Sequence, residues 1–137
     1  MGTFALTDCR VEVNGVVMSQ WVTSVQLPQE FEALEDTAFG DSARSRIAGL
    51  EDSTVTINFN DDFAAAAVDA TLWAARKTVV VVKVRPTTAA ISATNPEYVG
   101  SFLVNQINPF GNSVGQLATR SVAWPLSDPD GIARNTT

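Results

Sequence analysis

Two pairs of adjacent carboxylates are the side chains of this sequence best suited to acid and base chemistry. They are Glu51–Asp52 and Asp61–Asp62. Two carboxyl groups held close together can share the roles of proton donor and proton acceptor. Each pair, however, flanks the boundary of an expected secondary-structure element, where turn formation and helix capping account for it. We therefore assign no catalytic residue and expect no enzyme activity.

Nucleophilic and metal chemistry have little support. The chain has no histidine, so a serine or threonine nucleophile would need a lysine partner, and nothing recognisable surrounds either lysine. The single cysteine, Cys9, excludes an internal disulfide and is expected to pack in a strand. A cation site with oxygen ligands near the C-terminal end would use Asp128, Asp130 and Asn135. Their spacing matches no EF-hand loop, and we expect them to belong to a flexible chain end. We expect no metal and no cofactor.

Charge and hydropathy limit the class of protein. The net charge of −6 argues against a protein that grips nucleic acid, because phosphate binding depends on clustered Lys and Arg. An acidic surface can still line a passage for DNA, because it repels the phosphates and does not bind them. The other explanation of the negative charge is that it keeps the protein soluble. There is no uninterrupted apolar run of about 18 residues, and the start MGTFALTD lacks the features of a secretion signal. We expect a soluble protein made in the cytoplasm.

Hydrophobic periodicity predicts a mainly β protein. With 137 residues and 45% hydrophobic residues, the chain can form one domain, residues 1–137, with a real core. A hairpin around Asn14–Gly15 is the strongest local signal. Asn60 to Asp62 offer a cap for one helix over residues 63–77. The remaining strands are expected over 21–27, 54–59, 78–85, 98–107 and 116–124, with 78–85 central and covered on both faces and the last two forming an antiparallel pair. Six or seven strands and one flanking helix predict a β-sandwich or barrel.

One long inter-strand loop, residues 29–50, does not fit the pattern of a core strand or of a solvated loop. It carries Phe31, Leu34, Phe39 and Ile47 among carboxylates and arginines. Exposed apolar side chains of this kind call for a partner, so we predict an assembly arm. The alternative is a mobile loop whose Phe31 and Phe39 fold back onto their own core. The last segment, 127–137, has no periodicity and is expected to be a flexible tail.

The order of these segments resembles the tail tube (major tail) proteins of long-tailed bacteriophages, over nearly the whole chain. None of the shared segments is an invariant signature. They are DCRVEVNGVVMS at 8–19, Trp21–Val22, TAFGD at 37–41, RSRIAGL at 44–50, VTINF at 55–59, DATLW at 69–73 and YVGS at 98–101.

The resemblance implies hexameric rings, closed through sheet edges and stacked into a tube through which the genome leaves. It implies that the arm reaches neighbouring subunits, and that an acidic bore repels DNA, which passes without specific binding. The implied contact residues are Phe31, Leu34, Phe39, Arg44, Arg46 and Ile47, and the candidates for the lumen are Glu30, Glu32 and Glu35. Implied partners are further copies of the chain and the tape measure, tail terminator and distal tail proteins. The implied location is the virion tail, assembled in the bacterial host cytoplasm.

Two other interpretations remain. One is a single ring of the same fold, such as a tail terminator or a baseplate hub. The other is a small ligand-binding β-sandwich in which Trp21, Trp73 and Trp124 stack on a sugar. The predicted positions of Trp73 on a helix and Trp124 at a strand end argue against one shared platform.

Overall fold

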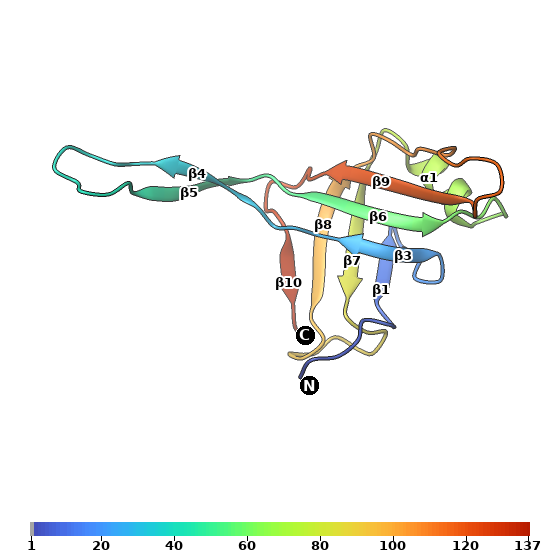
Figure 1. The fold of residues 1–137 in the computed structure, drawn as a ribbon. Helices are drawn as coiled ribbons and strands as arrows, with labels where there is room; N and C mark the ends of the chain where they lie inside the picture. The colour runs from blue at the N-terminus through green and yellow to red at the C-terminus, as the bar shows by residue number, and fades with distance from the viewer. Residues whose placement is uncertain (1) are drawn as a thin grey trace.

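The computed structural model describes residues 2–137, which form two β-sheets, a projecting hairpin and one helix (Figure 1). The first sheet has the order β10 (Ala133–Asn135), β8 (Glu97–Leu103), β7 (Val79–Arg85), β1 (Arg10–Val13), β2 (Val16–Val17). The second sheet has the order β3 (Val22–Gln26), β6 (Thr54–Asn60), β9 (Thr119–Pro125). The hairpin consists of β4 (Phe31–Glu35) and β5 (Arg46–Glu51), and the helix is α1 (Val68–Ala75). The prediction of a mainly β fold with one helix is confirmed.

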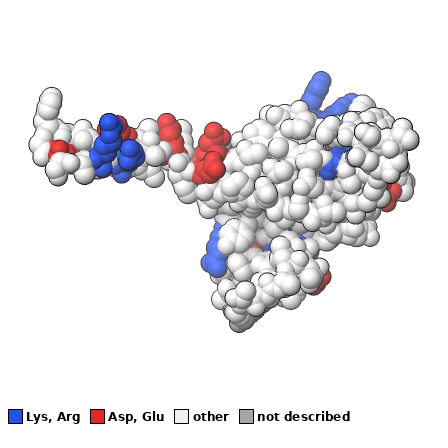
Figure 2. All heavy atoms as spheres, in the orientation of Figure 1, with Lys and Arg blue, Asp and Glu red and all other residues white. Residues whose placement is uncertain are grey.

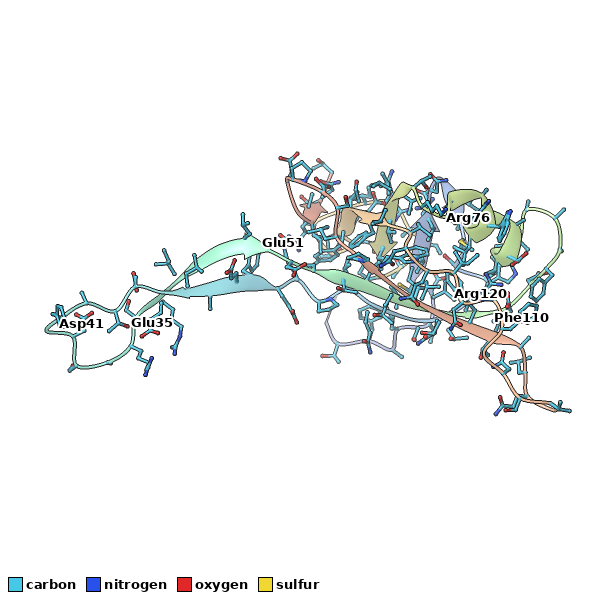
Figure 3. All side chains as sticks on the ribbon, turned by 90° about the horizontal axis from the view of Figure 1, so that it is seen from above. Glu35, Asp41, Glu51, Arg76, Phe110 and Arg120 are labelled. Atoms are coloured by element: carbon cyan, nitrogen blue, oxygen red, sulfur yellow. The ribbon has the colours of Figure 1, made fainter. Side chains whose placement is uncertain are left out.

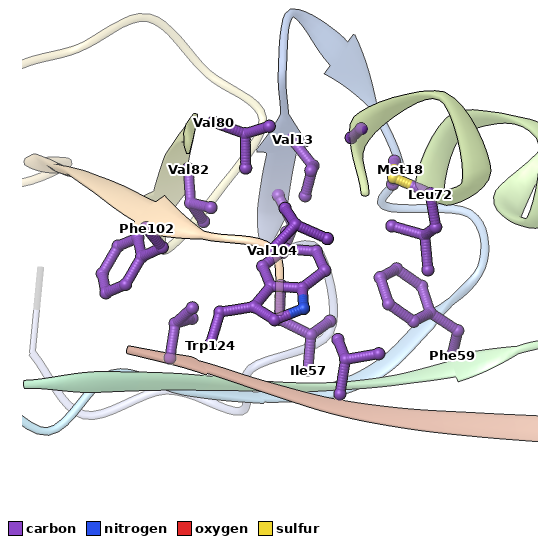
Figure 4. Packing of buried hydrophobic residues seen from close by; sticks show 14 of the residues in the cluster. Val13, Met18, Ile57, Phe59, Leu72, Val80, Val82, Phe102, Val104 and Trp124 are labelled. Carbon is purple, nitrogen blue, oxygen red and sulfur yellow. The ribbon is translucent and has the colours of Figure 1, made fainter. Parts of the chain in front are cut away.

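The core lies between the two sheets, whose strands cross steeply in Figure 1. Alternate residues of β6 point into it, because successive side chains of a strand face opposite sides. Val55, Ile57 and Phe59 are all fully buried. Trp124 of β9 is opposite Val55 in the sheet, and its ring lies near Ile57 (Figure 4). The helix closes one end of the sandwich with three buried residues, Val68, Leu72 and Ala75. We refer to the two sheets and the helix as the body.

The predicted first hairpin is confirmed. β1 and β2 pair antiparallel with Val13 opposite Val16, and Asn14 and Gly15 both have positive φ angles, 52° and 81°. This is the backbone of a type I′ turn, which matches the twist of the strands that it joins.

The helix is shorter than the sequence predicts and begins later. It starts after Ala67, which has no side-chain cap, and not near Asn60. Asp62 has other partners: one carboxylate oxygen accepts from the backbone N–H of Ala64 at 2.9 Å, and the other accepts from Trp21 Nε1 at 3.1 Å. These bonds hold residues 61–66 in an irregular connection, in which Ala66 has a φ of 61°.

Two expectations about the strands were wrong. Residues 98–107 and 116–124 do not form one antiparallel pair, because β8 joins the first sheet beside β7 and β9 joins the second beside β6. β7 is central in its sheet, but it is not covered on both faces. Val79 is 51% exposed and Val81 is exposed as well, so this side of the first sheet has no layer over it.

The segment 127–137 contains a strand, where the sequence predicts a flexible tail. β10 pairs antiparallel with β8, with Arg134 opposite Tyr98. Two backbone donors anchor the approach to β10: Ser127 N–H donates to Ser101 O at 2.8 Å, and Ile132 N–H donates to a Glu51 carboxylate oxygen at 2.9 Å. The partners of these bonds are distant in sequence, so local periodicity cannot reveal them.

No helix within residues 2–137 is long and apolar enough to cross a membrane.

Candidate assembly interface

The arm is a two-stranded hairpin that extends beyond the body (Figure 1). It continues the direction of β3 and β6, the strands that precede and follow it along the chain. Every residue of β4 is exposed, and most of β5 is exposed. Phe31 is 54% exposed and Phe39 is fully exposed, so neither ring caps the core of the body. The arm is therefore an ordered projection and not a loop folded back on its own subunit.

The register of the hairpin divides its side chains between two faces. Leu34 lies opposite Ile47, and Glu35 lies opposite Arg46. Because directly opposed residues share a face and neighbours alternate, one face is apolar and the other is charged at this point. The pairing shifts between Phe31 and Ala33, where β5 has one extra residue and Glu51 comes to lie opposite Phe31. Phe31 lies on the same side as Glu35, because the two residues are four positions apart in β4.

The tip of the arm is held by its own hydrogen bonds. Asp36 N–H donates to Ser45 O at 2.9 Å, and Ser45 N–H donates to Thr37 Oγ1 at 2.8 Å. Ala38 N–H donates to an Asp41 carboxylate oxygen at 2.8 Å, which closes the turn around Phe39. The tip therefore presents a fixed backbone with a fully exposed aromatic ring at its end.

The base of the arm is fastened to the body by Glu51. One carboxylate oxygen accepts from Gln29 Nε2 at 3.1 Å, and the other accepts from Ile132 N–H at 2.9 Å and Ser53 Oγ at 3.4 Å. A Cβ added at Gly131, whose φ is 76°, would lie 2.5 Å from Glu51 Oε1. Glu51 is thus a strand residue that joins the arm to the approach of β10, where the sequence suggested a turn.

The structure places all nine sequence-derived candidates on the arm but does not gather them into one patch. Leu34 and Ile47 lie on one face, Phe31 and Arg46 lie on the other, and Phe39 is at the tip. Arg44 donates to both Glu35 carboxylate oxygens, at 3.0 and 3.2 Å. Of the lumen candidates, Glu32 and Glu35 lie on opposite faces of β4, and Glu30 is at the base, where its N–H donates to Ser53 Oγ at 3.2 Å.

A second apolar surface, which the sequence did not suggest, lies at the end of the body opposite the arm. It consists of the connection 105–118 together with Phe63 and the helix residue Trp73, and we call it the loop end. Its exposed large apolar side chains are Phe63, Trp73, Phe110, Val114 and Leu117. The rings of Phe63 and Phe110 stack with their centroids 6.0 Å apart. The guanidinium of Arg76 lies 3.9 Å from the centroid of the Trp73 ring.

A buried ion-pair cluster lies beneath the loop end. Arg120 Nη2 is 3.2 Å from Asp61 Oδ2 and 3.0 Å from Asp69 Oδ1, and the Arg120 side chain is completely buried. The sequence predicts a capping role for Asp61 and gives no sign that Asp69 pairs with Arg120. A signal for the burial of Arg120 was present, because Arg120 has the same strand parity as the buried Val122 and Trp124. The cluster explains one of the carboxylate pairs as structural.

The other candidates for chemistry are also accounted for by local contacts. Cys9 is half-buried against the core, and burial, followed by the neighbouring charge of Asp8, raises the pKa of its thiol. Asp128 accepts from the N–H groups of Asp130 and Gly131 in a turn. Among residues 2–137, no group of three or more His, Cys, Asp or Glu side chains could hold a metal ion.

The three tryptophans do not form a shared platform. Trp124 is buried and its Nε1 donates to Gln106 O at 2.8 Å, whereas Trp21 is half-buried and bonded to Asp62. Trp73 is the one that is largely exposed, at the loop end. The stacking surface that a sugar-binding module would need is absent from the described residues.

The two crossed sheets, the helix at one end and the projecting hairpin define a fold shared with components of virion tails and baseplates. No protein-family model matches the sequence, and no curated protein matches it either. Solved structures do match. A chain in the virion of the native gene transfer agent particle is 12% identical, with 95% of each chain covered and a TM-score of 0.71.

Two further chains share the fold. One belongs to the tail of the empty gene transfer agent particle, determined with C6 symmetry, and is 13% identical over 94% of this chain and 93% of that chain, with a TM-score of 0.67. The other belongs to the six-fold symmetrised baseplate of the anti-feeding prophage and is 10% identical over 98% and 97% of the chains, with a TM-score of 0.54. The resemblance to phage tail proteins seen in the sequence is thereby confirmed at the level of the fold.

Proposed function

We propose that this chain is a structural virion protein whose copies form hexameric rings, and that the rings stack into a tail tube through which DNA leaves the particle. The observation that carries the proposal is the likeness, over 94% of the chain, to a chain of a tail with C6 symmetry. Its location would be the tail of the virion, after assembly in the bacterial host cytoplasm.

The exposed arm supports the proposal on physical grounds. An isolated two-stranded hairpin is only marginally stable in water, and this one has no layer on either face. Its apolar side chains would gain about 25 cal/mol for each Å² removed from water by a neighbouring subunit. We propose that Phe31, Leu34, Phe39, Arg44, Arg46 and Ile47 make this contact. Because they lie on two faces and a tip, the contact would enclose the arm.

Unpaired sheet edges offer a means of ring closure. β2 and β10 are the edges of the first sheet, and β3 and β9 are the edges of the second. An edge strand presents free N–H and C=O groups that pair readily with another chain. A ring uses this property productively, because each copy covers an edge of the next copy.

The net charge of −6 supports a bore that does not bind DNA, because like charges repel the phosphate backbone. Glu30, Glu32 and Glu35 remain our candidates for the lumen. Since Glu32 and Glu35 point to opposite faces of the arm, one wall would present only one of them. We further propose tape measure, tail terminator and distal tail proteins as partners of the tube. A conduit of this kind needs no cofactor and no catalytic residue.

Imaging of the purified protein tests this function. We expect rods or stacked rings with six-fold symmetry in negative-stain electron micrographs, and a broad, concentration-dependent mass distribution in light scattering. A protein that stays monomeric at every concentration and salt condition would refute the proposal.

The likeness to the anti-feeding prophage baseplate favours one second candidate, a single ring of the same fold such as a baseplate hub or a tail terminator. The two candidates predict different assemblies in the same experiment. A discrete hexamer that does not grow with concentration would select the single ring, whereas rods of variable length would select the tube.

A further inference from the structure

The subunit has two exposed apolar surfaces, and they lie at opposite ends. In Figure 3, Asp41 and Glu35 mark the arm at one end, and Arg76 and Phe110 mark the loop end at the other. Each surface includes a side chain with almost its whole area in water, Phe39 on the arm and Val114 at the loop end. Separate apolar patches of this kind mark interaction sites on soluble proteins.

The charges of the two surfaces are complementary. The arm, residues 29–50, has five carboxylates and two arginines, a net charge of −3. Figure 2 shows these charges set along the arm and interrupted by uncharged surface. The connection 105–118 has no charged residue, and the exposed charges beside it on the helix end are Arg76 and Lys77. An arm that lies across the connection therefore meets no charge on the connection itself and two cations at its margin. The carboxylates nearest to Phe63, those of Asp62 and Asp69, are partly exposed and already accept hydrogen bonds from Trp21 and Arg120.

We propose that the loop end is the docking surface for the arm of a second copy of this chain. The arm of the same subunit cannot fill it, because the arm leaves the body from the opposite end (Figures 1 and 3). The inference rests on the proposed self-assembly and adds to it the surface that receives the arm. Phe110 and Val114 are the central residues of this surface, and Arg76, held over Trp73, is at its edge.

This docking would be heterologous, since two different surfaces of the same chain meet. Every copy that docks its arm still has a free loop end, and every copy that receives an arm still has a free arm. Such a contact does not saturate in a pair: it closes into a ring or continues along an axis. The geometry therefore accounts for growth without a second kind of subunit.

Substitutions at the loop end test the proposal. Phe110→Ser and Val114→Asp should each raise the critical concentration for assembly by about 30-fold, the ratio typical of a central interface residue. Phe110→Leu is the matched control, because it keeps an apolar side chain at the same place, and it should assemble within a few-fold of the wild type. Val114 is fully exposed, so Val114→Asp should leave the thermal midpoint of the unassembled subunit unchanged even if Phe110→Ser lowers it.

A mixing experiment identifies the arm as the occupant. Phe39→Ser removes the arm surface and keeps the loop end, whereas Val114→Asp removes the loop end and keeps the arm. Each variant alone should stop at a limiting species, a subunit or one ring. An equimolar mixture should form a species of twice that mass and grow no further, because each pair uses the one intact arm and the one intact loop end.

Three results would overturn the inference. The first is assembly of Val114→Asp at the wild-type critical concentration, and the second is a mixture that gives no species of doubled mass. If wild-type protein still forms rods, either result shows that the docking surface is wrong while the tube proposal stands. Wild-type protein that never assembles would remove both proposals.

Discussion

Replacing Phe39 by alanine should separate assembly from folding. The ring is at the tip of the arm and is fully exposed, so the unassembled subunit loses no packing when it is removed. We expect the free energy of unfolding of the subunit to change by less than about 0.5 kcal/mol, as for other surface substitutions. The thermal midpoint of the unassembled protein should therefore be that of the wild type.

The effect on assembly follows from the area of the ring. Covering an aromatic side chain of about 150–200 Å² at about 25 cal/mol per Å² contributes roughly 4–5 kcal/mol. Ordering the side chain at an interface costs about 0.5–1.5 kcal/mol, and alanine retains part of the buried area. We expect Phe39→Ala to weaken each arm contact by about 2–3 kcal/mol, which raises the critical concentration by roughly 30- to 150-fold.

Sedimentation of assembled protein over a concentration series measures this shift, with differential scanning fluorimetry of the unassembled fraction as the folding control. Phe39→Leu should shift the critical concentration by less than about 10-fold, since it keeps most of the apolar area. A Phe39→Ala subunit that melts several degrees lower would mean that the ring packs on its own body. Unchanged assembly would mean that no neighbour covers it.

Three further predictions concern the body and the base of the arm. Arg120→Ala leaves the buried Asp61 carboxylate unpaired and should cost about 3–5 kcal/mol of unfolding free energy, a fall of roughly 10–15 °C in the midpoint by calorimetry; an unchanged midpoint would contradict the burial of the pair. Gly131→Ala forces an alanine into the left-handed region beside Glu51 and should cost about 1–2 kcal/mol. Hydrogen exchange should then quicken in β10, and protection equal to the wild type would argue against the fastening at the arm base. The raised pKa of Cys9 leaves less thiolate at pH 8 than in an ordinary thiol, so iodoacetamide should alkylate the native protein more slowly than the urea-unfolded chain, and equal rates would contradict the burial of the thiol.

Local patterns in the sequence predicted the elements whose side-chain environment repeats along the strand or is set by the turn itself. Val55, Ile57 and Phe59 alternate because β6 has a core on one face only, and the Asn14–Gly15 turn is specified by its own backbone. The start of the helix could not be found in this way. Alanine-rich residues 63–67 favour a helix, but Asp62 bonds to Trp21, 41 positions earlier, and holds this segment in another conformation.

Long-range pairing explains the other differences. β10 has three residues, and it is ordered by β8 and by Glu51, both distant in the chain. The composition of the arm indicated that it needs a partner, but its register depends on the Leu34–Ile47 pairing and on an extra residue in β5, which no alternation in the sequence marks. The sequence did not indicate the loop end. Its apolar residues Phe110, Val114 and Leu117 lie among turn-forming residues, and their spacing matches the period of neither a strand nor a helix.

The carboxylates of the arm have a consequence for free subunits in a crowded cell. Both outer edges of the arm are open, and identical open hairpins can stack on one another in the manner of amyloid. In an edge-to-edge stack every arm would lie beside an identical arm, so that its five carboxylates would meet five more carboxylates and only two arginines across a strand spacing of roughly 4.8 Å. Repulsion between these carboxylates makes such fibres unfavourable. The acidic residues of the arm therefore oppose the stacking of one arm on another, while they still allow the arm to dock on a different surface.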